Sequence, residues 1–317
     1  FFDAIKMSVS DSNHWEEFYE TTKPPKDINR IEIEIKNFCL EHLCSRIALI
    51  TSGGTTVPLE NNTVRFVDNF SAGLRGASSA EYFLKHGYAV VFLYRDNSLQ
   101  PFHRHFHRDQ FLDFLETVHN DGGCLGLKLK EGLVPNIAKV VKDYEQCKER
   151  CYFCTFTTLT EYLWLLRLVS IQLRHHKNKA LLYLAAAVSD FYIPENEMTE
   201  HKIQSNNGPL ELRLQLVPKM LRPLVSQWIP NAFIISFKLE TDENLLESKA
   251  REALQKYKHK VVISNLLQTR RTSVKIVTLK STELLTMDEC ELLQNVEIEE
   301  KIVCKIICLH NQHCSNF

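Results

Sequence analysis

The chain has 317 residues, 44% of them hydrophobic and 24% charged, and this balance is typical of a folded protein rather than of a disordered one. Its 38 Lys and Arg residues nearly cancel its 39 Asp and Glu residues, with no long run of either sign. A basic surface for nucleic acid is therefore not expected, and any nucleotide partner should be small. The apolar runs fall well short of the roughly 20 residues that span a bilayer, so no membrane segment is expected.

The beginning of the chain lacks the pattern of a secretory signal. Residues 1–7 contain no basic segment followed by an apolar run, and Met7 is a candidate start residue because the chain begins without Met. Residues 1–45 hold amphipathic patches on both sides of the turn-rich stretch 23–26. We expect two short helices there, in an N-terminal helical extension.

The ten cysteines are scattered along the chain, as expected of reduced thiols in a cytoplasmic enzyme. Cys147, Cys151 and Cys154 contain one CxxC spacing. No second CxxC and no nearby pair of histidines completes a four-ligand zinc set, so no metal site is predicted.

Short apolar runs alternate with helical patterns from residue 46 onward. Residues 46–51 and 88–94 are typical of strands buried on both faces, and residues 71–87 predict a helix with Ser71 as its cap and Gly87 at its end. A strand, a loop, a helix and a second strand in this order form a parallel βαβ unit. The expected fold class is α/β, a Rossmann-like three-layer α/β/α arrangement around a mostly parallel sheet.

The later segments continue this alternation, with two interruptions. Residues 97–135 are polar and irregular, with a solvated run of histidines at 103, 105 and 107 and a helix expected near residues 111–119. Leucines alternate with polar residues at 210–217, which predicts a half-exposed antiparallel strand outside the parallel core. Further helices are expected at 135–149, 159–175, 218–228, 243–257 and 289–308, and further strands at 180–188, 233–237, 261–264 and 274–279. We expect one domain at 46–303, followed by a tail at 304–317.

Ligands of open parallel sheets bind beyond the carboxyl ends of the strands. Residues 51–55 (TSGGT) follow the first strand, and backbone N–H groups beside Gly53 can approach a phosphate because no Cβ intervenes. An ordinary tight turn explains the same residues. Gly73 and Gly76 lie in the first turn of the predicted helix, whose N-terminus attracts anions, although glycines there also permit close packing.

The phosphate-binding patterns of two common families are absent. No Gly-Lys-Ser/Thr follows the glycines, which excludes a Walker A loop, and the long spacing between strand and helix excludes a dinucleotide GxGxxG motif. Connections in α/β units usually take about two to six residues, so residues 57–68 form an unusually long loop. This loop is either a flap or an arm that reaches a partner subunit.

Five short motifs, in order, resemble one known family. They are residues 51–55 (TSGGT), 64–76 (VRFVDNFSAGLRG), 185–191 (AAAVSDF), 201–204 (HKIQ) and 237–241 (FKLET). The pattern is similar to that of the phosphopantothenate–cysteine ligase family in its stand-alone eukaryotic form, over about residues 46–303. The head of 45 residues, the histidine-rich segment and the cysteine-rich tail have no counterpart in the pattern.

The resemblance implies a two-step reaction of coenzyme A biosynthesis. The carboxylate of 4′-phosphopantothenate attacks the α-phosphate of ATP or CTP, which gives an acyl-nucleotidylate and pyrophosphate. The amine of L-cysteine then displaces AMP or CMP and forms the amide. Such chemistry requires positioned substrates, Mg²⁺ with the nucleotide, and cations or backbone donors rather than an enzyme nucleophile. The resemblance also implies a homodimer, with a small antiparallel dimerisation element.

The resemblance assigns roles to individual residues. Asn69 covers the acyl intermediate, Lys202 stabilises charge on the α-phosphate, and Arg65 reaches the substrate of the other subunit. Nucleotide contacts are expected at Gly53, Ser71, Gly73, Gly76, Phe237 and Asn265, and phosphopantothenate contacts at Asn69, Ala186, Ala187, Asp190 and Arg65.

Other interpretations of these residues remain open. Phe237 is also explained by core packing, the alanines by sheet packing, and Lys202 by an ordinary surface position. The chain as a whole also fits a nucleotide-dependent oxidoreductase, against which the missing GxGxxG counts, or a non-catalytic homologue. The presence of Asn69, Asp190 and Lys202 gives no indication of inactivity.

Overall fold

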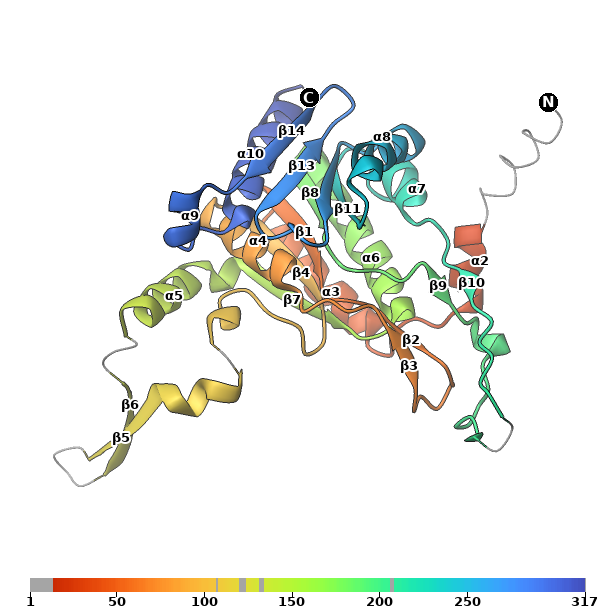
Figure 1. Ribbon diagram of the computed structural model, residues 1–317, viewed down its shortest axis with the longest axis horizontal. Helices are drawn as coiled ribbons and strands as arrows, with labels where there is room; N and C mark the ends of the chain where they lie inside the picture. Colours follow the sequence, from red (N-terminus) through yellow and green to blue (C-terminus); the bar gives the residue numbers. More distant parts are fainter. Residues whose placement is uncertain (1–13, 107, 120–123, 131–133, 206–207, 317) are drawn as a thin grey trace.

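The computed structural model describes residues 14–106, 108–119, 124–130, 134–205 and 208–316. A central eight-stranded sheet consists of β1 (Ile47–Ser52), β4 (Ala89–Arg95), β7 (Cys151–Phe156), β8 (Ala180–Leu184), β11 (Phe233–Glu240), β12 (Val261–Leu266), β13 (Ser273–Val277) and β14 (Thr282–Thr286). The strand order is β14-β13-β12-β11-β8-β1-β4-β7 (Figure 1). Pairing is parallel from β12 to β7 and antiparallel at β13 and β14.

Helices cover both faces of this sheet (Figure 1). Alternate residues of β1 enter different cores: Ile47 and Leu49 pack on one face, and Ala48 and Ile50 on the other. This arrangement confirms the predicted three-layer α/β fold. The helices are α2 (His14–Thr21), α3 (Ile28–Glu41), α4 (Leu74–Lys85), α5 (Val134–Cys147), α6 (Leu159–Leu173), α7 (Leu221–Pro223), which continues as a π-helical turn over Leu224–Trp228, α8 (Leu246–Tyr257), α9 (Glu289–Leu293) and α10 (Ile298–Ser315). No helix of the described residues is long and apolar enough to span a membrane.

The N-terminal segment forms helices α2 and α3 on the two sides of the turn at 23–26, as predicted. Both helices are part of the main core. Phe18 and Ile35 are buried in the same cluster as Leu49 of the sheet, and Tyr19 donates a hydrogen bond from its hydroxyl to the carbonyl of Leu163 (2.8 Å). The segment therefore covers one face of the sheet from residue 14 onward.

The C-terminal segment differs from the single helix expected at 289–308. It forms two helices, and α10 continues through most of the expected tail, to Ser315. His310 is fully buried near its end, between the Tyr88 hydroxyl (2.8 Å) and the Asn178 carbonyl (2.9 Å). Burial lowers the pKa of His310 to about 4, so the imidazole is neutral at pH 7.

The excursion after β4 contradicts one expectation. A short 3-10 helix (Arg108–Phe114) is followed by the antiparallel hairpin of β5 (Leu115–His119) and β6 (Leu125–Leu129), where a helix was expected. His103 and His105 are exposed, as expected of a solvated segment, although the Nε2 of His105 lies 3.0 Å from a carboxylate oxygen of Glu81. Arg104 bridges Glu81 and Glu297 beside it and anchors the excursion to α4. His107 lies outside the described residues.

Strand β7 was not predicted, and it explains why the CxxC spacing forms no chelate. Cys151 packs on one face of the sheet and Cys154 on the other, because residues three apart in a strand point in opposite directions. Cys147 lies on the face of Cys151. Within the described ranges, no group of three or more His, Cys, Asp or Glu side chains is placed to hold a metal ion.

Two further small antiparallel ribbons, besides the β5–β6 hairpin, lie beside the sheet (Figure 1). One pairs β2 (Thr56–Pro58) with β3 (Phe66–Asp68), within the long loop. The other pairs β9 (Phe191–Tyr192) with β10 (Gln215–Leu216). The antiparallel strand predicted at 210–217 is thus confirmed only at its end. Its leucines at 210, 212, 214 and 216 are exposed.

Candidate functional site

The loops that follow β1 and β8 are hydrogen-bonded to each other at the carboxyl edge of the sheet. Ala187 donates its N–H to the Gly53 carbonyl (2.8 Å), Thr55 donates to the Ala187 carbonyl (3.0 Å), and Ala186 donates to Oγ1 of Thr51 (3.1 Å). We call residues 51–55 and 186–189 the double loop. The N–H groups of both alanines are therefore used inside the chain, and Ala186 packs against the hydrophobic cluster that contains Leu49.

Asn69 is fixed against the double loop by its backbone. Its N–H donates to the Thr55 carbonyl (3.1 Å), and a Cβ added to Gly54 would lie 1.7 Å from the Asn69 carbonyl oxygen. Only glycine allows this approach. The side-chain amide of Asn69 makes no hydrogen bond with the described residues, so it is available to a ligand.

The N-terminus of α4 lies beside the double loop, with two differences from the sequence expectation. The N-cap is Gly73, in the left-handed region (φ +82°), and not Ser71, whose Oγ accepts a hydrogen bond from the Gly73 N–H (3.3 Å). A Cβ on Gly76 would lie 2.4 Å from Oγ of Ser52, so this glycine allows α4 to pack on the end of β1. The N–H groups of residues 74–76 find no acceptor among the described residues, which suits an anion.

A cation that the sequence interpretation did not select completes this end of the site. Arg95 ends β4, and a Cβ on Gly53 (φ +85°) would lie 2.7 Å from the Arg95 Cβ. Its guanidinium pairs with the Asp68 carboxylate (2.6 Å), which also accepts a hydrogen bond from Thr56 (3.0 Å). The sequence could have indicated Arg95, because it directly follows the apolar run 88–94. The end of that strand lies at the same edge of the sheet as the end of β1.

Phe237 and Asn265 lie on neighbouring strands of the same sheet. The Phe237 ring packs edge-on against the buried Tyr183 ring (4.9 Å between centroids), and the Tyr183 hydroxyl lies 2.9 Å from Ser79 of α4. Asn265 is only 7% exposed, yet its side-chain amide makes no hydrogen bond with the described residues. Its amide atoms are not among the buried polar atoms that lack a partner in the described residues, so they reach the surface and can meet a polar ligand group.

Asp190 and Lys202 are both exposed and lie in the segments that follow the double loop. The Asp190 carboxylate pairs with the ammonium of Lys219 (3.0 Å), a lysine that the sequence interpretation missed. Lys202 makes no ion pair with the residues described. The structure thus brings together Gly53, Asn69, Ala186 and Ala187, whereas Lys202 forms no hydrogen bond or ion pair with them in the described structure.

The long loop is organised around one buried carboxylate. Glu60 is fully buried and accepts hydrogen bonds from the N–H groups of Val64 (3.2 Å), Arg65 (2.9 Å) and Ile203 (3.3 Å) and from the Arg65 guanidinium (2.9 Å). These bonds, the one from the Arg65 N–H foremost, lower the pKa of Glu60 to about 2. Arg65 also donates to the Ile203 carbonyl (3.0 Å). Its guanidinium is therefore held by Glu60 and by the backbone of Ile203, while 38% of its side-chain surface stays exposed.

This carboxylate gives the loop a defined acid sensitivity. Because the pKa of Glu60 is below its ordinary value in the folded state, its stabilisation is complete at neutral pH and is lost as the pH falls from about 4.5 toward 2. Hydrogen exchange at the Arg65 amide, corrected for intrinsic rates, should lose protection over that window. Glu60→Gln should start less protected and show no such loss. A wild-type amide with constant protection would contradict this role.

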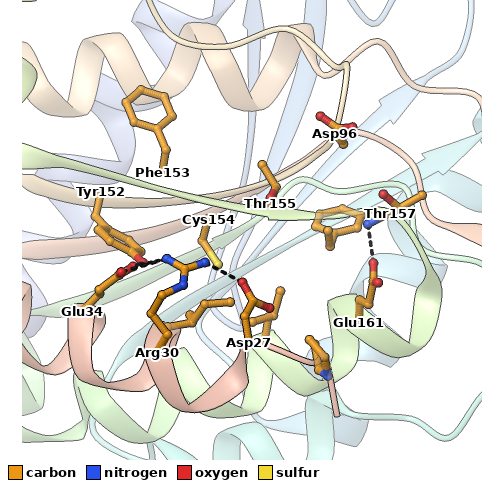
Figure 2. Close-up of a pocket in the computed structure, with 14 residues that line it drawn as sticks. Asp27, Arg30, Glu34, Asp96, Tyr152, Phe153, Cys154, Thr155, Thr157 and Glu161 are labelled. Carbon is orange, nitrogen blue, oxygen red and sulfur yellow. Dashed lines mark hydrogen bonds and ion pairs between the residues drawn. The ribbon is translucent and has the colours of Figure 1, made fainter. Parts of the chain in front are cut away.

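A separate pocket of about 330 Å³ lies between α3 and β7 and contains none of the predicted site residues (Figure 2). Its charged side chains already have partners within the described residues. The Arg30 guanidinium pairs with Glu34 (2.8 Å) and Asp27 (2.6 Å), and the Tyr152 hydroxyl donates to Glu34 (2.7 Å). We interpret this pocket as a polar contact region between α3 and the edge strand β7, and not as a ligand site.

Comparison with known proteins places this architecture in a family. Residues 167–307 match the model of the DNA/pantothenate metabolism flavoprotein C-terminal domain. The chain is 48% identical to phosphopantothenate–cysteine ligase of Homo sapiens over 261 residues, which cover 81% of this chain and 84% of that protein. It is 41% identical to phosphopantothenate–cysteine ligase CAB2 of Saccharomyces cerevisiae, over 94% of this chain and 86% of that protein.

A solved structure agrees with the sequence comparison. A Cab2 mutant in complex with phosphopantothenate-cysteine is 41% identical to this chain and superposes with a TM-score of 0.84, over 95% of this chain and 99% of that one. These relatives cover most of the chain, between 81% and 95% of it. The chain belongs to the phosphopantothenate–cysteine ligase family.

Proposed function

We propose that this protein joins 4′-phosphopantothenate to L-cysteine through an acyl-nucleotidylate, a step of coenzyme A biosynthesis. The observation that carries the proposal is the double loop, which places Asn69 and the two alanines beside the open N-terminus of α4. A carboxylate substrate and a nucleotide phosphate can meet there. The substrates are proposed from the similarity of this chain to phosphopantothenate–cysteine ligases.

The proposed chemistry needs no covalent bond to the protein. A carboxylate oxygen attacks the α-phosphorus, an acyl–O–P bond forms, and pyrophosphate leaves. The cysteine nitrogen then attacks the acyl carbon, a C–N bond forms, and the acyl–O bond breaks with release of the nucleoside monophosphate and a proton. Asn69 is proposed to hold the intermediate, with Asp190 on the phosphopantothenate and Lys202 at the α-phosphate. Their work is positioning and charge stabilisation.

The nucleotide is proposed to lie between α4 and β12. Free N–H groups of the first α4 turn, with Gly53, Ser71, Gly73 and Gly76, suit its phosphates. Phe237 and the unpaired amide of Asn265 suit the nucleoside. ATP is the expected cosubstrate, with CTP as the alternative. Since the described part of the chain offers no carboxylate cluster for a metal, Mg²⁺ is proposed to enter with the phosphates, whose charge it offsets.

We propose further that the protein acts as a cytoplasmic homodimer. The ten cysteines are free thiols, which suits a reducing compartment. The β2–β3 hairpin exposes Phe66, Val67 and, just beyond it, Phe70, whose side chain is 96% exposed. Contiguous exposed apolar residues are typical of an interface. In a dimer this hairpin would present Arg65 to the partner's site.

Shared sites predict complementation between two inactive variants. When Arg65→Ala and Asn69→Ala proteins are unfolded together and refolded as a mixture, half of the dimers are mixed, and each mixed dimer has one intact site. We expect about a quarter of wild-type activity to return. Each variant refolded alone is the control. A mixture no more active than its components, or a monomeric mass in solution, would contradict the role of Arg65.

The intermediate itself is tested by an isotope experiment. 4′-Phosphopantothenate labelled with ¹⁸O in its carboxylate should transfer one labelled oxygen to the released AMP or CMP, because the acyl–O bond breaks in the second step. Mass spectrometry of the nucleotide measures the transfer. Amide formation with unlabelled nucleotide and labelled phosphate would instead indicate an acyl phosphate.

A further inference from the structure

A cleft of about 560 Å³ lies between α2, the β9–β10 ribbon and the ends of α7 and α8. Among its lining residues is Lys219, whose ammonium pairs with Asp190. Asn69, Ala186, Ala187 and Asp190 do not line it. The cleft is therefore a space distinct from the double loop, and one ion pair links it to Asp190, the residue that follows the loop.

One wall of the cleft is aromatic and comes from the N-terminal helix. Trp15 packs edge-on against Trp228 (5.6 Å between centroids), and Phe18 packs against Tyr192 in the same way (5.6 Å). Phe18 is buried, whereas Trp15 and Tyr192 are half-buried and line the cleft. Rigid rings of this kind bind an apolar or aromatic body. Helix α2 therefore contributes to the cleft, although the proposed reaction assigns no function to this helix.

Three basic side chains also line the cleft. Lys219, Arg222 and Lys256 line it from α7, the residues before it, and α8. Arg222 is half-buried and makes no ion pair with the described residues. Lys219 and Asp190 have 52% and 72% of their side-chain surfaces exposed, so their pair is weak and an anion can compete for the ammonium.

Two carboxylates also line the cleft, and their position restricts where an anion can bind. Glu17 and Glu197 come from α2 and the turn after β9, and both lie near Tyr192. Burial and then these two charges raise the pKa of the Tyr192 hydroxyl. A phosphate group is repelled from that end and directed to the three cations, while hydrogen-bond donors of the same ligand suit the carboxylates.

We propose that this cleft is a second ligand site, which binds a small phosphate monoester with an apolar or aromatic body. Its phosphate lies on Arg222, Lys256 and Lys219, and its body lies on Trp15 and Tyr192. When the phosphate draws Lys219 away, Asp190 loses its partner, so occupancy alters the binding of 4′-phosphopantothenate. This coupling rests on the proposed role of Asp190, whereas the binding itself does not.

Calorimetric titration of the full chain with phenyl phosphate, without nucleotide, tests the binding. Arg222→Met and Lys256→Met should each weaken it by about tenfold, as expected for the loss of a charge-assisted contact. Lys280→Met removes an exposed cation outside the cleft and should change nothing. Inorganic phosphate should bind more weakly than phenyl phosphate, and Trp15→Ala should remove that difference. Wild-type affinity in both cation variants would overturn the proposal.

Competition distinguishes a second site from an extension of the first. Phenyl phosphate should still bind when 4′-phosphopantothenate is saturating, and Asn69→Ala should leave its affinity unchanged. It should shift the apparent affinity for 4′-phosphopantothenate in the wild type but not in Lys219→Met. Simple displacement by 4′-phosphopantothenate would overturn the proposal. Because binding is measured without turnover, an inactive enzyme that still binds phenyl phosphate would refute the ligase function alone.

Discussion

Asn69→Ala is expected to lower the rate of amide formation at saturating substrates by about a hundredfold or more, the usual effect of removing a group that stabilises a charged intermediate. The structure separates this effect from folding. The backbone of Asn69 is held by Thr55 and lies against Gly54, and both contacts survive the substitution. The side-chain amide has no partner to lose in the described structure.

The matched control is Asn61→Ala, on the same loop. Asn61 is exposed and donates to the Glu200 carboxylate (3.2 Å), so its loss should leave turnover nearly unchanged. Steady-state kinetics and thermal unfolding of both variants are the measurements. A nearly normal rate for Asn69→Ala, with the fold intact, would remove Asn69 from the site.

Gly54→Ala is expected to have the second large effect, on stability and turnover together. Its Cβ would overlap the Asn69 carbonyl oxygen at 1.7 Å, and backbone cannot give way as a flexible side chain does. Overpacking of this kind costs about 2–3 kcal/mol of unfolding free energy. Because the displaced group is Asn69 itself, turnover should fall even where the variant remains folded.

Gly87→Ala provides the contrast for this prediction. A Cβ there would meet nothing within 4 Å, but the residue has φ +82°, in the left-handed region. We expect a cost of about 1 kcal/mol from backbone strain and no change in turnover. Denaturant unfolding and kinetics on the pair test both statements. Equal turnover in Gly54→Ala and wild type would contradict the close approach of Gly54 and Asn69.

The core of the fold was predictable because its strands are continuous apolar runs, such as residues 47–50 and 89–94, separated by a capped helix. The errors arose where the sequence pattern of a segment does not tell whether a neighbouring strand is there to pair with it. The alternation at 210–217 favours a strand along its whole length, yet within the described residues only Gln215 and Leu216 pair with another strand. Strand β7 lies between two helical patterns without Gly or Pro beside it and was missed.

The site residues that directly follow strands could be predicted from the sequence. The contacts between segments distant in the sequence could not. Gly73 was selected as a phosphate-binding glycine, but its role as N-cap in place of Ser71 depends on a backbone angle that sequence does not reveal. The approach of Gly54 to Asn69 and the pairing of Lys219 with Asp190 join residues 15 and 29 positions apart. Only the folded arrangement shows such pairs.

The most direct test of the ligase function is reconstitution with the purified protein. 4′-Phosphopantothenate, L-cysteine and Mg²⁺ are incubated with either ATP or CTP, and pyrophosphate and the amide product are measured together. The proposed function predicts equal amounts of pyrophosphate, nucleoside monophosphate and 4′-phosphopantothenoylcysteine with at least one of the two nucleotides. The absence of pyrophosphate with both nucleotides would contradict it.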